Sequence, residues 1–197
     1  MKKLFLVILI AAVGSFYMGS CNPDSGLTSP EEPTINKGSE PNWITLPVNS
    51  RQVLRKEFSA SQRIKQYTGG TIEINESYSG GPLGTVTVSA TISFDPQFYD
   101  RNLYGVNELI TLVVDDETCT SKFSPDMDFL KPATYNVSYT GIDLSGIDPA
   151  LVNFVYQAED GSVENMEYDR IDVDSSTGLL SVVNAKIPHF SRFGFVN

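Results

Sequence analysis

One stretch, Thr85–Phe94, constrains the fold more than any other part of the chain. Apolar side chains occupy every second position from Val86 to Phe94, and serine or threonine fills each position between them. Side chains of an extended strand point to the same face at a period of two. The stretch therefore predicts a β-strand with one face in a hydrophobic core and the other face in solvent.

Shorter segments with similar alternation predict further strands around 71–75, 135–139, 154–156, 171–174, 179–187 and 193–196. Leu109–Val114 is a nearly continuous apolar run, which predicts a strand buried on both faces. Ser79–Pro82 and Ser175–Gly178 are turn clusters, and the second predicts a hairpin. For residues 47–68 the sequence does not decide between a strand and a short helical turn.

This pattern predicts the fold class. At least seven short strands, regular turn signals and almost no helical periodicity are typical of all-β proteins. We expect an antiparallel β-sandwich of about seven or more strands, with a barrel as the alternative. The chain of 197 residues suits one such domain, which we place at residues 42–197, from the first apolar contacts Trp43, Ile44 and Leu46.

The first 20 residues have the composition of an export signal. Two lysines precede an apolar run from Leu4 to Met18, and the small residues Gly19 and Ser20 follow it. The run is shorter than the roughly 20 residues that a membrane-spanning helix needs. Residues 21–41 are rich in proline, serine, glycine and glutamate and predict a flexible tether.

Cys21 follows these small residues, and the segment resembles a bacterial lipoprotein signal. Met18 stands where that signal prefers leucine, valine or isoleucine. The resemblance implies lipidation of Cys21, with cleavage by an ordinary signal peptidase and a retained anchor as alternatives. Asn22 replaces the aspartate that retains some lipoproteins in the inner membrane, which favours the outer membrane. The membrane, through lipid on Cys21, is thus the first predicted partner.

Charge excludes some functions. The chain carries a formal net charge of −10, and removal of Lys2 and Lys3 with the signal makes it more negative. Nucleic-acid binding needs a basic patch, so we expect no nucleic-acid partner. With Cys21 lipidated, Cys119 has no partner within the chain, and we expect it in or near the core rather than at a catalytic site.

Three segments together resemble the bacterial relatives of ZU5 domains, a β-sandwich family. They are Gly69–Ile72, Phe123–Ala133 and Ile187–Phe193, and the similarity covers about residues 69–197. Between Phe94 and Leu109 the chain departs from the family pattern, which has a proline-rich loop of small residues there. The resemblance implies a ZU5-like β-sandwich.

The sequence His189-Phe190-Ser191 contains the only histidine of the chain. In some ZU5-containing proteins a His-Phe-Ser sequence cleaves itself between the phenylalanine and the serine. The resemblance would make Ser191 the nucleophile and His189 the general base, in an N-to-O acyl shift. The structural alternative, which we prefer, has both side chains hydrogen-bonded in a turn while Phe190 fills the core.

Two further features predict binding only weakly. Asp172, Asp174 and Ser176 are spaced like the start of a calcium loop, but the glycine and glutamate that an EF-hand loop needs later are missing. A polar hairpin turn is the preferred interpretation. Tyr99 and Tyr104 offer aromatic rings for binding if exposed, although we expect them to cap the end of the core.

These observations predict a lipid-anchored cell-envelope protein whose β-sandwich is a non-catalytic interaction or structural module. We expect no cofactor, and a partner that is an envelope or extracellular protein or a glycan. The alternatives are a self-processing domain that cleaves between Phe190 and Ser191, and a carbohydrate- or calcium-binding module.

Overall fold

The computed structural model describes residues 41–46, 58–115 and 117–197. The predicted signal at 1–20, Cys21 and the tether up to residue 40 lie outside these ranges, as does the segment 47–57. Within the described ranges, no helix has the length and apolar character needed to cross a membrane.

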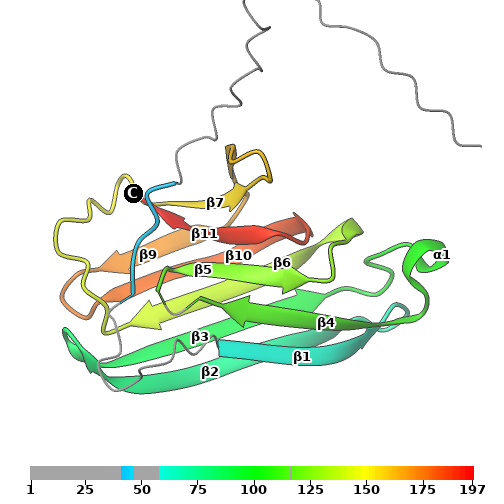
Figure 1. Ribbon diagram of the computed structural model, residues 1–197, viewed down its shortest axis with the longest axis horizontal. Helices are drawn as coiled ribbons and strands as arrows, with labels where there is room; N and C mark the ends of the chain where they lie inside the picture. Colours follow the sequence, from blue (N-terminus) through cyan, green and yellow to red (C-terminus); the bar gives the residue numbers. More distant parts are fainter. Residues whose placement is uncertain (1–40, 47–57, 116) are drawn as a thin grey trace, which may run out of the picture. The chain divides into compact units, whose positions relative to one another are not determined.

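The described residues form two antiparallel sheets packed face to face (Figure 1). The six-stranded sheet has the order β1-β4-β5-β11-β7-β8, and the five-stranded sheet has the order β2-β3-β6-β10-β9. This confirms the predicted all-β sandwich. The elements are β1 Phe58–Lys65, β2 Gly70–Gly81, β3 Gly84–Phe94, α1 Arg101–Tyr104, β4 Asn107–Val114, β5 Thr120–Ser124, β6 Asp128–Thr140, β7 Asn153–Gln157, β8 Val163–Asn165, β9 Arg170–Asp174, β10 Leu179–His189 and β11 Arg192–Val196.

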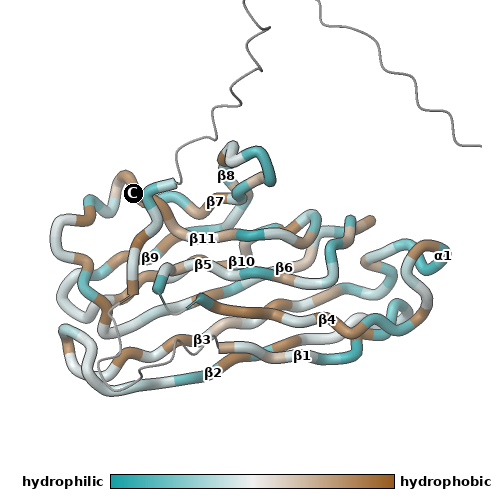
Figure 2. The backbone as a smooth tube through the Cα atoms, viewed as in Figure 1, coloured by the Kyte–Doolittle hydropathy of each residue, from teal (hydrophilic) through white to brown (hydrophobic). Residues whose placement is uncertain are grey.

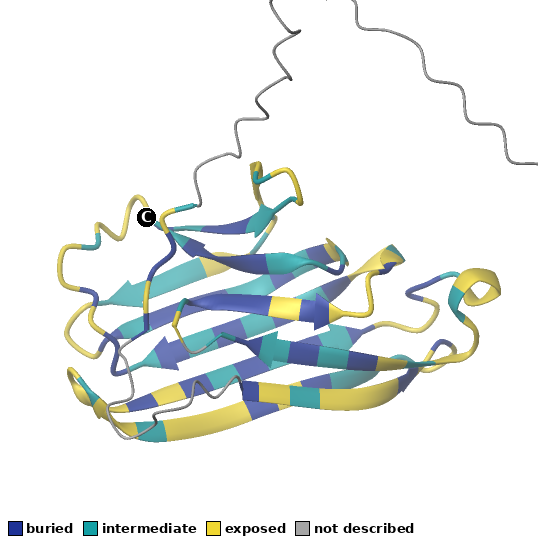
Figure 3. Ribbon diagram, viewed as in Figure 1, coloured by how far each residue is buried: buried dark blue, intermediate teal, exposed yellow. Residues whose placement is uncertain are grey.

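Strand β3 confirms the alternation predicted for Thr85–Phe94. Its five apolar side chains are all buried, whereas the serines and threonines between them are exposed or half-buried. β2 and β6 flank it in the sheet, and the alternating burial is visible along these strands in Figure 3. Figure 2 shows the matching alternation of hydropathy. One face of the sheet therefore forms half of the core.

The hairpin predicted around Ser175–Gly178 is also present. β9 pairs with β10 from Leu179↔Asp174 to Val183↔Arg170. Beyond Val182 the pairing of β10 with β6 shifts at Asn184, which has a positive φ of 57°. This bulge inserts a residue and returns Ala185 and Ile187 to the buried face.

The prediction that Leu109–Val114 is buried on both faces is wrong. Ile110, Leu112 and Val114 are buried, but Leu109 is 49% exposed and Val113 is only half-buried. The strand belongs to a sheet that packs against the core with one face only. A run of apolar residues in an antiparallel sandwich thus still has a solvent side.

Three strands and one helical turn were not predicted. β1, in the region that the sequence left open, has only two buried side chains, Phe58 and Ile64. β5 buries the polar residues Thr120 and Ser121, and all three residues of β8 are exposed. None of these segments has a full apolar alternation, so pairing with neighbouring strands, rather than their own composition, makes them strands of the sheet.

The core lies between the sheets and includes a hydrogen bond that joins them. Ser121 on β5 and Tyr135 on β6 have their hydroxyl oxygens 2.6 Å apart, and burial raises the pKa of Tyr135. Near the C-terminus, the Ile44 amide donates to the Phe195 carbonyl at 3.1 Å. Ile44 and Leu46 are buried, as expected for the first apolar contacts of the domain.

Candidate functional site

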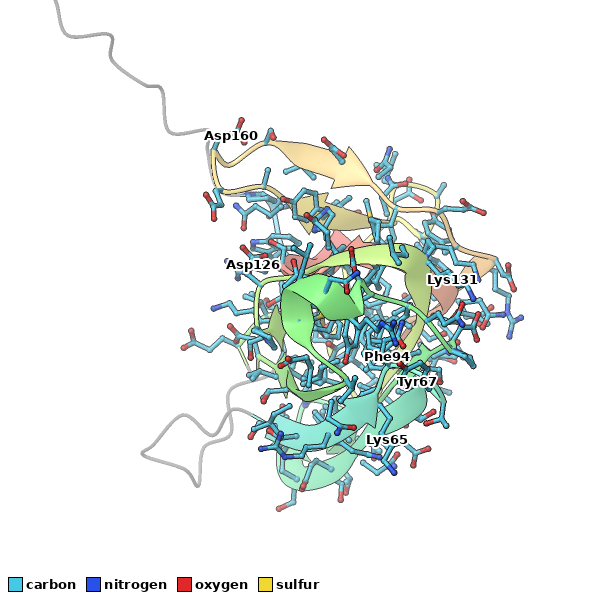
Figure 4. All side chains as sticks on the ribbon, turned by 90° about the vertical axis from the view of Figure 1, so that its right-hand side faces the viewer. Lys65, Tyr67, Phe94, Asp126, Lys131 and Asp160 are labelled. Carbon is cyan, nitrogen blue, oxygen red and sulfur yellow. The ribbon has the colours of Figure 1, made fainter. Side chains whose placement is uncertain are left out.

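Three segments distant in sequence meet at one end of the sandwich, which we call the loop end: residues 66–69, 95–106 and 125–131. The Gln97 amide donates to the Gln66 carbonyl at 2.6 Å, and the Gln66 amide donates to the Val106 carbonyl at 3.0 Å. The Leu130 amide donates to the Phe98 carbonyl at 2.7 Å. Figure 4 looks onto this end, with Lys131, Tyr67 and Lys65 along one side and Asp126 on the other.

Local backbone features place these segments. Gly69 has a φ of 66°, and a Cβ at this position would overlap the carbonyl oxygen of Phe94. Only glycine allows the turn after β1 to approach the end of β3 this closely. The Asp100 side chain accepts a 2.9 Å hydrogen bond from the Asn102 amide and thereby caps α1.

Aromatic rings fill the core beneath the loop end. Phe98 contacts Phe94 with a centroid separation of 4.6 Å, and Phe129 contacts Phe190 at 4.7 Å. Tyr99 is fully buried at the edge of this group, and Tyr104 is half-buried against it at 6.0 Å. The two tyrosines therefore cap the core, as the preferred interpretation of the sequence expected, and neither ring is a freely exposed platform.

A pocket of about 370 Å³ opens between these segments, with Gln66, Tyr67, Gln97, Tyr99, Arg101 and Leu130 in its lining. Tyr67 is 53% exposed, and the Arg101 guanidinium lies 5.8 Å from the centre of its ring. Arg101 also donates a hydrogen bond to the Tyr67 hydroxyl. Gln97, at the rim, has a positive φ of 64°, an unusual conformation for a residue other than glycine and a common one at binding sites.

Two residues of the pocket lining each have a buried polar atom with no hydrogen-bond partner among the described residues. The two atoms are Oε1 of Gln66, whose residue is 6% exposed, and the hydroxyl oxygen of Tyr99, whose residue is 0% exposed. Gln66 uses its Nε2 atom to donate to the Tyr99 carbonyl at 3.2 Å. Unpaired buried polar atoms cost free energy and are uncommon in folded proteins, so these two atoms make the pocket a candidate ligand site.

The loop end also carries exposed apolar side chains. Tyr67, Leu103, Val106 and Leu130 are four of the eight large hydrophobic residues that are exposed in the described part of the chain. Leu103 on α1 is 74% exposed and Leu130 on β6 is 67% exposed. Clustered exposed apolar side chains around a pocket are typical of a surface that contacts a ligand.

His189 is the last residue of β10, and Ser191 lies in the turn between β10 and β11. The His189 ring packs edge-on against Tyr156 at 4.6 Å. The Ser191 hydroxyl donates to the Gln157 carbonyl at 3.4 Å, and the described hydrogen bonds include none between His189 and Ser191. Phe190 is buried in the aromatic core. Ser191 thus bonds to a neighbouring strand rather than to the predicted base, while self-cleavage itself stays a prediction.

The aspartates of the predicted calcium-like loop have separate tasks within the hairpin. Asp172 pairs with Arg170 at 3.1 Å. Asp174 accepts hydrogen bonds from the Ser176 hydroxyl at 2.7 Å and the Thr177 hydroxyl at 2.9 Å. The bonds from Ser176 and then Thr177 lower the pKa of Asp174. Across 41–46, 58–115 and 117–197, no group of three or more metal-ligating side chains is found.

Cys119 is 1% exposed. Burial, with a smaller contribution from Asp115, raises the pKa of its thiol, which disfavours the thiolate that a nucleophile needs. The sequence prediction of a core cysteine is confirmed. Cys21, the predicted lipidation site, lies outside the described residues.

Two other hollows are less suited to be the site. The larger, about 620 Å³, is lined by Trp43, Leu46 and Asp143 among others. Trp43 Nε1 and Asn197 Oδ1 in its lining also lack a hydrogen-bond partner among the described residues, but the lining includes none of their exposed large hydrophobic side chains. The smaller, about 220 Å³, is a shallow region on the outer face of β3, β6 and β10. Its Asp172 is already paired with Arg170, and its lining includes no unpaired buried polar atom among the described residues.

Sequence reasoning found the loop 95–107 but missed Gln66 and Arg101 as site residues. Gln66 lies in the region whose structure the sequence left open, and its role depends on contacts with Gln97, Tyr99 and Val106 from another loop. The available signal was the break in alternation between Phe94 and Leu109, where polar and aromatic residues mix. Such a loop on a regular sandwich commonly carries function.

Comparison with known proteins identifies no relative of this chain. No family model matches it, and no curated protein or solved structure gives a match. A functional proposal therefore rests on the fold and on the geometry of the loop end.

Proposed function

We propose that this chain is a lipid-anchored protein of the cell envelope whose β-sandwich is a non-catalytic binding module. Its ligand contacts the loop end. The observation that carries the proposal is the coincidence of a pocket, two unpaired buried polar atoms and four exposed apolar side chains on that one end. A solvated surface without a ligand has no physical need for this combination.

Anchoring follows from the N-terminal sequence. A basic start, an apolar run and Gly19-Ser20-Cys21 support acylation of the cysteine sulfur and attachment to the outer membrane. The polar segment that follows gives the module reach from the membrane surface. The negative charge of the chain keeps the module soluble and away from anionic lipid headgroups.

Metabolic labelling with palmitate tests the anchor. The wild-type chain should incorporate label and fractionate with the outer membrane, and the Cys21→Ala variant should do neither. Label in the variant, or wild-type protein in the soluble fraction, would contradict lipidation at Cys21.

Binding to envelope fragments tests the module. A soluble chain that begins after Cys21 should sediment with purified envelope fragments, and the Leu103→Asp and Leu130→Asp variants should sediment less. Leu83→Asp is the matched control, because Leu83 is 51% exposed but lies in the turn between β2 and β3, at the other end of the sandwich (Figure 1). Equal binding by all variants would overturn the assignment of the ligand to the loop end.

The ZU5 resemblance is a compatible family proposal. It implies a β-sandwich, the architecture of the described residues. The loop 95–106, where the sequence departs from the family pattern, is also the segment that builds most of the candidate site. If the chain belongs to this family, we expect its ligand to differ from those of other members, because the loop that builds most of the site differs from the family pattern.

A further inference from the structure

We propose that the pocket at the loop end binds a saccharide unit of an envelope or extracellular glycan. The inference rests on the proposed function and names the ligand class for the same site. Its basis is the chemistry of the pocket lining: amide, guanidinium and phenol groups stand beside one exposed aromatic ring and one leucine. A sugar ring offers the complement of this set, with hydroxyl groups around its edge and C–H groups on its faces.

The unpaired oxygen of Gln66 specifies what the ligand must provide. The Tyr99 carbonyl can only accept, so the Gln66 side chain must direct its nitrogen toward that carbonyl and leaves Oε1 without a donor. A ligand that reaches Oε1 has to donate a hydrogen bond to it. The Tyr99 hydroxyl, also unpaired, is able to donate or accept. A sugar hydroxyl can both donate and accept a hydrogen bond, so it can pair with the Gln66 oxygen or with the Tyr99 hydroxyl.

Tyr67 supplies the apolar contact. Its ring is 53% exposed, and the hydrogen bond and stacking from Arg101 hold it in place at the rim. The amphipathic ring of tyrosine suits a ligand with both apolar and polar edges. Leu130, on the facing segment, adds a second apolar wall.

Other ligand classes fit less well. The Asp100 carboxylate, the only one among the described residues of the pocket lining, already accepts from the Asn102 amide and from its side chain, whereas a calcium ion needs several free oxygen ligands. The net charge of −10 disfavours a nucleic acid. A pocket of about 370 Å³ lies in the range that encloses a small polar ligand.

Two treatments of the envelope fragments separate a glycan from a protein partner. Periodate cleaves the bond between carbons that carry neighbouring hydroxyl groups and so destroys most sugar rings, whereas protease digestion removes protein. The soluble chain should bind protease-treated fragments and should lose binding to periodate-treated fragments. Binding that survives periodate or disappears with protease would overturn the saccharide proposal.

Variants of the lining connect this binding to the pocket. Tyr67→Ala removes an exposed ring and Gln66→Met removes the unpaired oxygen, and each should weaken binding to protease-treated fragments by roughly tenfold. Leu83→Ala, at the other end of the sandwich, should leave binding unchanged. Because Gln66 is buried, its variant is compared only after circular dichroism shows a native melting transition, and Tyr67→Ala carries the test if that variant fails to fold.

The two proposals fail in different ways. Loss of binding in Leu103→Asp and Leu130→Asp together with protease sensitivity would keep the loop end as the binding site and reject the saccharide. Wild-type binding by Leu103→Asp, Leu130→Asp and Tyr67→Ala would reject the loop end itself. Periodate-sensitive binding that all three substitutions weaken supports both proposals.

Discussion

The loop end and the opposite end of the sandwich close the same two sheets with different kinds of segment. The opposite end, which we call the turn end, consists of residues 82–83, 141–152 and 175–178. There Gly141 donates to the Thr177 carbonyl at 3.1 Å, and the Asp143 side chain accepts from the Ser145 amide at 2.8 Å. The loop end instead has four exposed large hydrophobic residues beside its pocket, whereas the described residues of the turn end include two, Leu83 and Leu151.

The two ends should therefore contribute differently to the stability of the fold and to ligand binding. At the turn end, glycines and aspartates satisfy the backbone in tight turns, so a substitution there should weaken the fold. At the surface of the loop end, the exposed side chains contribute little packing, so a substitution there should alter binding and leave stability unchanged. Four predictions test this contrast, from the largest expected effect to the smallest.

The largest effect should come from the core beneath the loop end, because a substitution of a buried residue weakens the fold at either end of the sandwich. Phe190 contacts Phe94, Phe123 and Phe129 and is 2% exposed. Phe190→Ala should lower the free energy of unfolding by about 4 kcal/mol, because it leaves a cavity among these rings. Phe190→Leu should cost less than half as much. Urea unfolding measures both, and an alanine variant of wild-type stability would contradict this packing of the rings.

At the turn end, Gly178 has a φ of 63°, and a Cβ there would overlap the carbonyl oxygen of Ile142. Gly178→Ala should lower the free energy of unfolding by about 3 kcal/mol through strain and steric overlap. Gly146 is the matched control, since its φ is 84° and no atom lies within 4 Å of the position that a Cβ would take. Gly146→Ala should cost only about 1 kcal/mol. Equal costs in thermal and urea unfolding would refute the role of the close approach.

Leu103→Asp at the loop end should change the free energy of unfolding by no more than about 0.5 kcal/mol, because the side chain is 74% exposed. The same variant should bind envelope fragments less well, which is the reverse of Gly178→Ala. Stability from urea unfolding and binding from sedimentation are measured on the same preparations. A variant that loses stability and binding together would break the contrast between the two ends.

The smallest effect concerns pH and the hairpin of β9 and β10. Hydrogen bonds from Ser176 and Thr177 lower the pKa of Asp174 below the ordinary value of 3.8. Its ionised form therefore stabilises the fold above that ordinary value, and the contribution is lost as the pH falls through the lowered pKa. The melting temperature should drop in this acid range, and by less in Asp174→Asn. Identical acid profiles for the two chains would show that Asp174 contributes nothing.

Motif reasoning and three-dimensional structure selected different residues as candidates for function. His189, Ser191, Asp172 and Asp174 are recognisable in the sequence because their spacing is local. In the fold, Ser191 contacts a neighbouring strand and Asp172 and Asp174 serve the hairpin. The lining of the loop-end pocket has no such spacing, because Gln66, Arg101 and Leu130 come from three separate segments.

The sequence by itself determined the all-β class, the position of β3 and the hairpin before Leu179, because alternation and turn chemistry act between near neighbours in the chain. Only the tertiary structure decided that β4 has a solvent face, that β1, β5 and β8 are strands and that Gln66 lies beside Tyr99. The physical reason is that these features depend on pairing and burial against distant residues. The Gln66 oxygen that lacks a donor is a product of that packing, and the amino-acid type alone does not reveal it.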